Sequence, residues 1–105
     1  MNELERTGLR KELVEQIVKV ILKHDKPKRV ILFGSRARGD FSSVSDIDLA
    51  VEGVENAALI REILDEEVDT LLKFDVVDLN KVPDYLKEKI EKEGIVLYDE
   101  EREKV

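Results

Sequence analysis

The sequence predicts an α/β fold with a small mixed β-sheet and helices packed against it. Two kinds of pattern alternate along the chain. Apolar residues spaced three and four apart indicate amphipathic helices, and short apolar or alternating runs indicate strands. The order is helix, strand, strand, helix, strand, helix, strand. At 105 residues, this length fits one domain over 1–105 with one core.

The first half of the chain predicts a long helix followed by two strands. Apolar residues recur at helical spacing at Leu9, Leu13, Ile17, Val20 and Ile21. They predict a helix over 9–24. An unbroken apolar run predicts a central strand over 28–33, buried on both faces. We expect a short helix, capped by Ser35, to run through Gly39, and a polar loop to lead into a strand over 46–52.

The second half repeats the alternation of helix and strand. The patterns predict, in order, a helix over 56–72, a strand over 74–79 and a helix over 83–93. Pro83 suits the first turn of the last helix, and Gly94 suits its end. Residues 95–98 are expected to form an edge strand or to pack against the sheet. Residues 99–105 are expected to form a frayed, charged tail.

Composition narrows the class of function. The residues are 42% hydrophobic and 41% charged, with a net charge of −7, which argues against nonspecific binding to nucleic-acid backbones. No run approaches the roughly 20 apolar residues of a membrane span, and no signal peptide is apparent, so we expect a cytoplasmic protein. Without Cys and with a single His, a metal must be held by oxygen, which suits Mg²⁺ or Mn²⁺.

An acidic pair is the first candidate site. Asp46 and Asp48 flank Ile47 in a predicted strand, so their side chains lie on one face, about 6.6 Å apart at the backbone. Both carboxylates can bind one metal ion or bridge two. Alone, an Asp-x-Asp pair is equally consistent with solvent-facing strand residues. Aspartate is nevertheless disfavoured in strands, so two in one short strand call for a reason.

A third carboxylate is expected from the next predicted strand. Asp75 and Asp78 lie on opposite faces of this strand because side chains alternate along it. Only one of them can join the acidic pair. We select Asp75, which follows Phe74 at the beginning of the strand.

A glycine–serine turn precedes the acidic pair. Gly34 permits close approach of the backbone to a ligand, and the peptide N–H groups after it, with the Ser35 hydroxyl, can bind phosphate oxygens. Arg36 and Arg38 add positive charge, although they could instead balance neighbouring acids. The glycine spacing matches a P-loop, but Asp40 stands where the phosphate-binding lysine is required.

These residues carry a family resemblance. Gly34-Ser35, ten intervening residues and Asp46-x-Asp48 form a pattern that resembles the nucleotidyltransferase superfamily that includes DNA polymerase beta. The strand that contains Asp75 looks like the one that supplies the third carboxylate. The short chain and the sequence around Gly34 look like those of the minimal nucleotidyltransferases, the MntA-type antitoxins encoded beside HEPN-domain proteins. The resemblance covers about residues 10–98.

The resemblance implies a reaction and a set of roles. Asp46 and Asp48 would coordinate two Mg²⁺ ions, Asp75 would complete one site and help to activate the acceptor hydroxyl, and Gly34 and Ser35 would hold the triphosphate. AMP would pass from ATP to a tyrosine of a HEPN toxin partner and silence it. We expect the acceptor to come from a partner, because a chain of this length leaves no room for an acceptor-binding domain.

Two other functions remain open from the sequence. The first is a non-catalytic antitoxin that neutralises its partner by covering it, which the high acidity would favour for a basic partner surface. The second is nucleotidyl transfer to a small molecule or an RNA end. Nothing in the sequence identifies the base of the nucleotide.

Overall fold

The computed structural model describes residues 3–103 as four strands and six helical segments. The helical segments are η1 Glu3–Thr7, α1 Lys11–His24, α2 Gly34–Arg38, α3 Ala57–Glu67, α4 Asp84–Glu93 and α5 Glu100–Glu103. The strands are β1 Arg29–Phe33, β2 Ile47–Glu52, β3 Phe74–Asp78 and β4 Ile95–Asp99. The predicted α/β fold, with a small mixed sheet and helices packed against it, is confirmed.

The four strands form one mixed sheet in the order β3-β2-β1-β4. The pairs β1–β2 and β1–β4 are antiparallel, and β2–β3 is parallel. The central position predicted for β1 is confirmed, and the open question about residues 95–98 is resolved as an edge strand. The antiparallel pairing of β1 with β2 places the end of one strand beside the start of the other.

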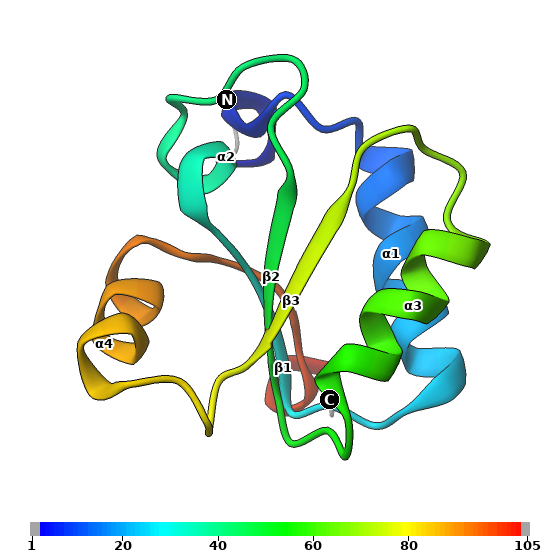
Figure 1. Cartoon of the computed structure of the whole chain (residues 1–105), viewed down its shortest axis with the longest axis vertical. Coiled ribbons are helices and arrows are strands. Elements are labelled where there is room, and N and C mark those ends of the chain that lie inside the picture. Colours follow the sequence, from blue (N-terminus) through cyan, green and yellow to red (C-terminus); the bar gives the residue numbers. More distant parts are fainter. Residues whose placement is uncertain (1–2, 104–105) are drawn as a thin grey trace.

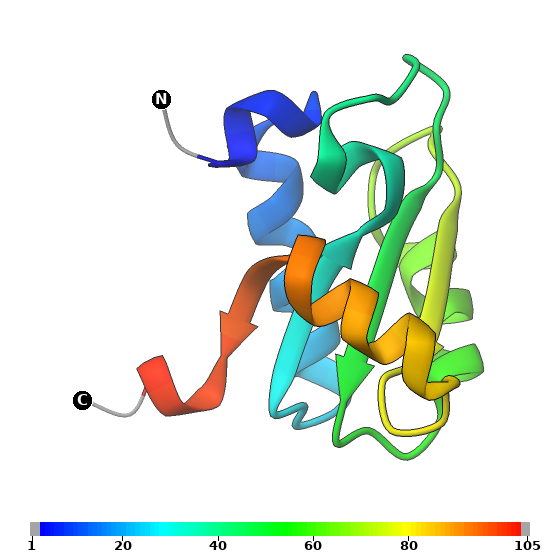
Figure 2. The same cartoon turned by 90° about the vertical axis from the view of Figure 1, so that its left-hand side faces the viewer.

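Helices cover the two faces of the sheet unequally (Figure 1). The long helices α1 and α3 lie side by side on one face, whereas α2 and α4 lie on the other. Figure 2 shows α4 crossing in front of the strands, with α2 above it. The part of this second face beyond α4, where β1 ends and β2 and β3 begin, is the part that holds the candidate site.

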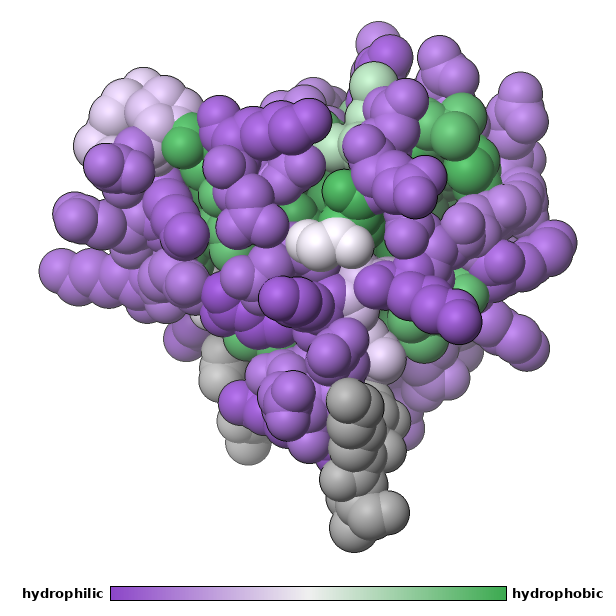
Figure 3. Space-filling model, turned by 90° about the horizontal axis from the view of Figure 1, so that it is seen from below, coloured by the Kyte–Doolittle hydropathy of each residue, from purple (hydrophilic) through white to green (hydrophobic). Residues whose placement is uncertain are grey.

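Two apolar clusters hold the layers together. The larger joins α1 and α3 to the sheet through residues such as Ile17, Leu49 and Leu64, all fully buried. The smaller joins Ile90 of α4 to Ile31 on the opposite face. The many charged residues lie outside, and hydrophilic side chains cover most of the face seen in Figure 3. Across residues 3–103, each helix is too short or too polar to cross a bilayer.

Helix α3 is shorter than its apolar pattern predicts. The expectation of a helix over 56–72 is wrong at its end, because α3 stops at Glu67. Three consecutive acids, residues 65–67, lie at that end, where the helix dipole disfavours negative charge. Val68 then adopts an extended conformation and buries its side chain in the larger cluster. Val68 is therefore buried in the core although the helix has already ended.

Two smaller expectations also need correction, and one helical segment was not expected. Helix α2 begins at Gly34, with Phe33 in the N-cap position, so Ser35 lies inside the first turn and does not cap the helix. The charged tail is not frayed over the described residues: α5 begins where the Glu100 N–H donates to the Lys28 carbonyl at 2.9 Å. Residues 104–105 of that predicted tail lie outside the described residues. The segment η1 was not predicted.

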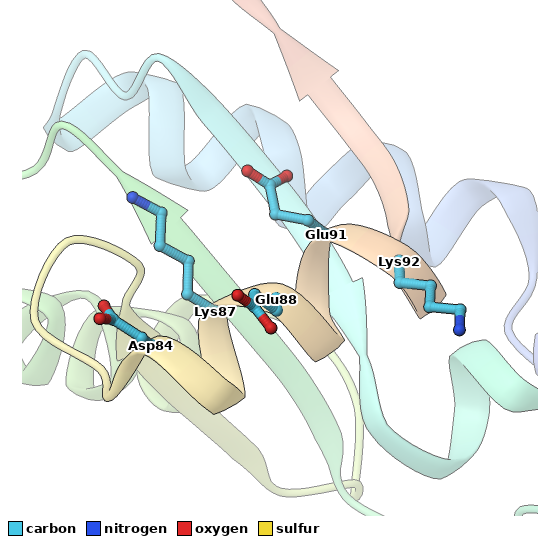
Figure 4. Close-up of a pocket in the computed structure, with 5 residues that line it drawn as sticks. All are labelled: Asp84, Lys87, Glu88, Glu91 and Lys92. Carbon is cyan, nitrogen blue, oxygen red and sulfur yellow. The ribbon is translucent and has the colours of Figure 1, made fainter.

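An arginine attaches α4 to the sheet. Arg29 of β1 donates to Glu52 of β2 at 2.8 Å and to both carboxylate oxygens of Glu91 on α4, at 2.7 and 2.9 Å. The two carboxylates raise the pKa of the Arg29 guanidinium. Figure 4 shows Glu91 on α4 among four other charged side chains. A half-buried arginine that pairs with two carboxylates contributes more to stability than an arginine in an exposed ion pair.

We predict that Arg29→Met lowers the free energy of unfolding by about 2 kcal/mol, since two carboxylates lose their partner in a partly desolvated position. Urea denaturation measures the loss. The control is Lys11→Met, which breaks an exposed pair with Glu15 on α1 and should change stability by less than about 0.5 kcal/mol. Equal losses in the two variants would contradict the role of Arg29.

Candidate active site

The structure brings the three predicted carboxylates to one edge of the open sheet face. Asp48 on β2 pairs in register with Asp75 on β3, so their backbones are direct neighbours. Asp46 immediately precedes β2, and its side chain is exposed. Asp78, the rejected alternative, pairs in register with Val51, whose side chain is buried in the cluster beneath α1 and α3. Alternation along the strands thus places Asp75, and not Asp78, with the acidic pair.

The glycine–serine turn lies against one of these carboxylates. Phe33, the last residue of β1, pairs with Asp48, and Gly34 follows with φ of +75°. A Cβ atom at position 34 would overlap Oδ2 of Asp48. Gly34 is therefore required twice, for its left-handed backbone and for the space beside Asp48. The turn and the acidic pair form one structural unit.

The three carboxylates repel one another. Burial, Asp75 and Asp46, in that order of effect, raise the pKa of Asp48 to about 6, and Arg38 opposes the rise. Asp48 is half-buried, whereas Asp46 and Asp75 are exposed. A carboxyl pKa raised by burial together with neighbouring acids is typical of functional sites. It means that these carboxylates are held together at a cost to the fold.

The donor set of this cluster fits a divalent cation. Within residues 3–103, no three acidic, His or Cys side chains are already gathered closely enough to enclose a metal ion. The three aspartates nevertheless offer only oxygen donors, the preference of Mg²⁺ and Mn²⁺. A cation would remove the repulsion that raises the pKa of Asp48. Asp46, Asp48 and Asp75 are the residues that would hold it, by turning their side chains toward it.

Helix α2 directs its beginning toward the same edge. The first N–H groups of a helix have no carbonyl partner within that helix, and α2 begins at Gly34 beside Asp48. Ser35 lies in this first turn, so its hydroxyl is close to these groups. Gly39 ends the helix in the left-handed conformation, with its N–H bonded to the Ser35 carbonyl at 2.9 Å. The turn presents donors where the sequence predicted them.

Arg38 lines a small pocket between α2 and α4. The pocket, of about 110 Å³, also contacts Phe33, Gly34, Leu86, Lys89, Ile90 and Glu93. The Arg38 guanidinium pairs with Asp40 at 3.2 Å and with Glu93 at 3.8 Å. Because Arg38 lowers the pKa of Asp48, its positive charge lies within electrostatic reach of the carboxylates. The expectation that Arg38 lies at the site agrees with this position.

Arg36 points away from this pocket. Its side chain is buried, 2% exposed, and donates to the backbone carbonyls of Thr7 and Ser45, at 2.9 and 3.0 Å. The guanidinium also lies over the Phe41 ring, 4.7 Å from its centre. The sequence-based expectation that Arg36 contacts the nucleotide does not fit this geometry, because the donors of the guanidinium are occupied by backbone carbonyls. Arg36 and Arg38 diverge because they lie two residues apart on a helix.

Another pocket, on the outer face of α4, lacks these features. It has a volume of about 510 Å³ and is lined by Asp84, Lys87, Glu88, Glu91 and Lys92 (Figure 4). Three acids and two lysines lie on one helix, so their charges largely cancel. None of the predicted site residues lines it. The edge that holds Asp48 is the better candidate.

Sequence reasoning missed the contribution of α4 to the site. Leu86, Lys89 and Glu93 line the small pocket beside Gly34. Their spacing marks one face of a helix, which the sequence could predict, but a packing face and a pocket wall give the same pattern. Only the fold shows that this face meets α2.

The model of the family described as "Polymerase beta, Nucleotidyltransferase" matches residues 15–103. The chain belongs to this nucleotidyltransferase family. The match includes the turn at Gly34 and all three aspartates. As a family member, the protein is an enzyme of nucleotidyl transfer, and its substrate is a nucleotide.

Relatives place this nucleotidyltransferase among small members of the family. A Methanocaldococcus jannaschii protein named as a protein adenylyltransferase is 34% identical over 87 residues, which cover 80% of this chain and 92% of the relative. The solved structure of a toxin–antitoxin with AMP-PNP contains a chain that is 26% identical, with a TM-score of 0.70, over 86% of this chain and 76% of that one.

A more distant structure shares the fold. It is described as a tri-AMPylated Shewanella oneidensis HEPN toxin in complex with an MNT antitoxin. The matched chain is 22% identical, with a TM-score of 0.65, over 90% of this chain and 76% of that one. At that identity the likeness concerns the nucleotidyltransferase fold alone.

Gly34→Ala should damage both stability and nucleotide binding in this nucleotidyltransferase. We expect a loss of about 3 kcal/mol in urea denaturation, because backbone strain adds to a clash with Asp48. Gly39→Ala is the matched control: φ is +91° there, but the nearest heavy atom to an added Cβ is the Arg6 carbonyl oxygen, 3.9 Å away. It should cost about 1 kcal/mol and leave ATP binding intact. Equal effects of the two variants would refute the close-approach role of Gly34.

Asp48→Asn should stabilise the metal-free protein. In the folded state Asp48 keeps its proton up to about pH 6, but in the unfolded chain it ionises near 3.8. The folded state therefore binds more protons between these values, and stability falls as pH rises through them. After allowance for solvent screening, we expect the variant to gain about 1 kcal/mol at pH 7.5 in EDTA.

The gain should be largely lost at pH 3.5, where Asp48 is mostly protonated in both states. Thermal unfolding at the two pH values measures it, with Asp78→Asn as the control, since Asp78 does not raise the pKa of Asp48. A gain that persists unchanged at pH 3.5 would show that the cost of ionising Asp48, through burial and repulsion by Asp75 and Asp46, is not its source.

Proposed function

We propose that the protein is an Mg²⁺-dependent protein adenylyltransferase. It transfers AMP from ATP to a tyrosine hydroxyl of a HEPN-domain partner and thereby acts as an antitoxin. The observation that carries the proposal is the unit formed by Gly34, Asp48 and Asp75 on the open face of the sheet. This unit joins a phosphate-binding turn to a carboxylate cluster in a chain whose relatives are named as protein adenylyltransferases.

The residues divide into two groups by chemistry. Gly34 and Ser35 hold the triphosphate, with the N–H groups of the first turn of α2 as donors. Asp46, Asp48 and Asp75 would hold two Mg²⁺ ions, and Mn²⁺ could replace them. Bound Mg²⁺ supplies positive charge for the phosphate oxygens on which negative charge develops.

The transfer is an in-line displacement at the α-phosphate. The acceptor oxygen forms a bond to the α-phosphorus as the bond to the β-phosphate oxygen breaks, and pyrophosphate leaves. Asp75, the exposed carboxylate at the start of β3, accepts the proton of the hydroxyl. Arg38 adds positive charge beside Asp48, on the side where the small pocket opens between α2 and α4. The remainder of the open face is left for the acceptor.

The proposed partner rests on two lines of support. The motif from Gly34 to Asp48 resembles that of MntA-type antitoxins. A toxin–antitoxin structure with AMP-PNP, 26% identical in the matched chain, shares the fold over 86% of this chain. A tyrosine acceptor on a HEPN partner brings these findings together.

We predict that labelled ATP and Mg²⁺ transfer label to a HEPN-domain protein encoded beside this one. Asp75→Asn should lower the rate at least 100-fold, because the variant removes a metal ligand and the proton acceptor. Asp78→Asn is the control on the same strand and should retain the rate, since Asp78 faces away from the cluster. Gel autoradiography gives the rates, and mass spectrometry identifies the modified tyrosine.

The two alternative functions give different outcomes in this experiment. A non-catalytic antitoxin would neutralise the partner without ATP, and the Asp46→Asn/Asp48→Asn double variant would neutralise it equally well. Transfer to a small molecule or an RNA end would label that acceptor without the partner. Labelling of the partner by the Asp46→Asn/Asp48→Asn variant would contradict the proposed mechanism.

A further inference from the structure

Arg36 is a buried cation that the proposed chemistry does not use. Its side chain is 2% exposed, and it is the largest fully buried side chain among the described residues. Burying a charged group is costly unless its donors are satisfied. Its guanidinium contacts the N-terminal segment at Thr7 and the loop that leads to Asp46. Such a costly placement at the edge of an active site calls for a reason.

The guanidinium holds the loop directly before the catalytic strand. Its Nε donates to the Ser45 carbonyl at 3.0 Å, and a terminal nitrogen lies 3.4 Å from the Ser43 carbonyl. The ring of Phe41, in the same loop, stacks against it. Ser45 directly precedes Asp46, so the Arg36–Ser45 bond fixes the peptide from which the Asp46 side chain departs.

The other end of this arrangement is the N-terminal segment. Arg36 donates to the Thr7 carbonyl at 2.9 Å. Thr7 is itself fully buried, with its hydroxyl bonded to the Leu4 carbonyl at 2.6 Å and to the Leu9 N–H at 3.1 Å. Gly8 has a φ of +72°, and a Cβ there would overlap the Phe41 ring. The segment is therefore closely fitted to the loop, with Arg36 between them.

We propose that Arg36 is a positioning residue for metal binding: it ties the loop over 41–45 to the N-terminal segment and so sets the place of Asp46 in the carboxylate cluster. The position of Asp46 depends on the Arg36-held loop more than that of Asp48 or Asp75 does, because the latter two lie within paired strands and Asp46 does not. The inference rests on the proposed function for the metal, but its structural part concerns only the loop.

The test measures metal binding and loop opening in the whole chain without ATP or partner. Mn²⁺ affinity is read by electron paramagnetic resonance, and loop opening by amide hydrogen exchange over 41–47. Arg36→Met keeps an apolar stem and removes every donor. Arg36→Lys keeps the charge but has no planar fork to reach several carbonyls. Ile60→Ala, in the α3 core, is the control for a general loss of stability, chosen because it lies on the opposite face of the sheet.

Both Arg36 variants should bind Mn²⁺ about tenfold more weakly, as is usual when a residue that orients a ligand is lost, and exchange over 41–47 should accelerate. Ile60→Ala should keep the wild-type Mn²⁺ affinity. Wild-type affinity and protection in Arg36→Lys would overturn the inference, even if Arg36→Met fails to fold. An equal loss of affinity in Ile60→Ala would overturn it too.

Failure of the proposed function gives a separate result. If the unaltered protein does not bind Mn²⁺, the metal-dependent reaction is contradicted. Hydrogen exchange over 41–47 then still decides whether Arg36 holds the loop. Faster exchange in the Arg36 variants would support the structural part, and unchanged exchange would overturn it.

Discussion

The close approach of Gly34 to Asp48 is the constraint on which the rest of the structure depends. Antiparallel pairing of β1 with β2 sets Phe33 opposite Asp48, so the chain leaving β1 must turn beside a carboxylate. A Cβ there would overlap the Asp48 carboxylate, and the left-handed backbone also disfavours any residue other than glycine. The same pairing therefore brings together a turn that offers N–H donors and an acid that offers oxygen. Asp75 joins them because β3 adds in parallel at the other side of β2.

Such a cluster weakens the fold locally, and the surrounding layers offset this. The apolar contacts beneath α1 and α3 lie on the opposite face of the sheet, where residues such as Leu49 are fully buried. Arg29 fixes α4 to the strands, and α4 in turn forms one wall of the pocket at Gly34. Arg36 secures the loop before Asp46. The open part of the second face can thus remain exposed and acidic.

Local sequence patterns predicted much of the carboxylate cluster and of the fold around it. Alternation assigned Asp46 and Asp48 to one face of their strand and set Asp75 and Asp78 on opposite faces of theirs. The choice of Asp75 rested on its place at the start of the strand, and the register of β2 with β3 puts it beside Asp48. The role of Arg36 could not be predicted, because its bond to Thr7 spans 29 residues and depends on how a loop closes. The early end of α3 could not be predicted either. Val68 fits the helical period, but its side chain enters the core from an extended backbone. Periodicity reports which residues are buried, not which conformation buries them.

We infer that the turn at Gly34 and the three aspartates form one site for a metal-bound nucleoside triphosphate. The most direct measurement is a crystal structure with a non-hydrolysable ATP analogue and Mn²⁺, with data collected at the manganese absorption edge. We expect anomalous peaks between Asp46, Asp48 and Asp75, with the triphosphate on the first turn of α2. A triphosphate bound elsewhere, or manganese peaks that contact none of these carboxylates, would contradict it.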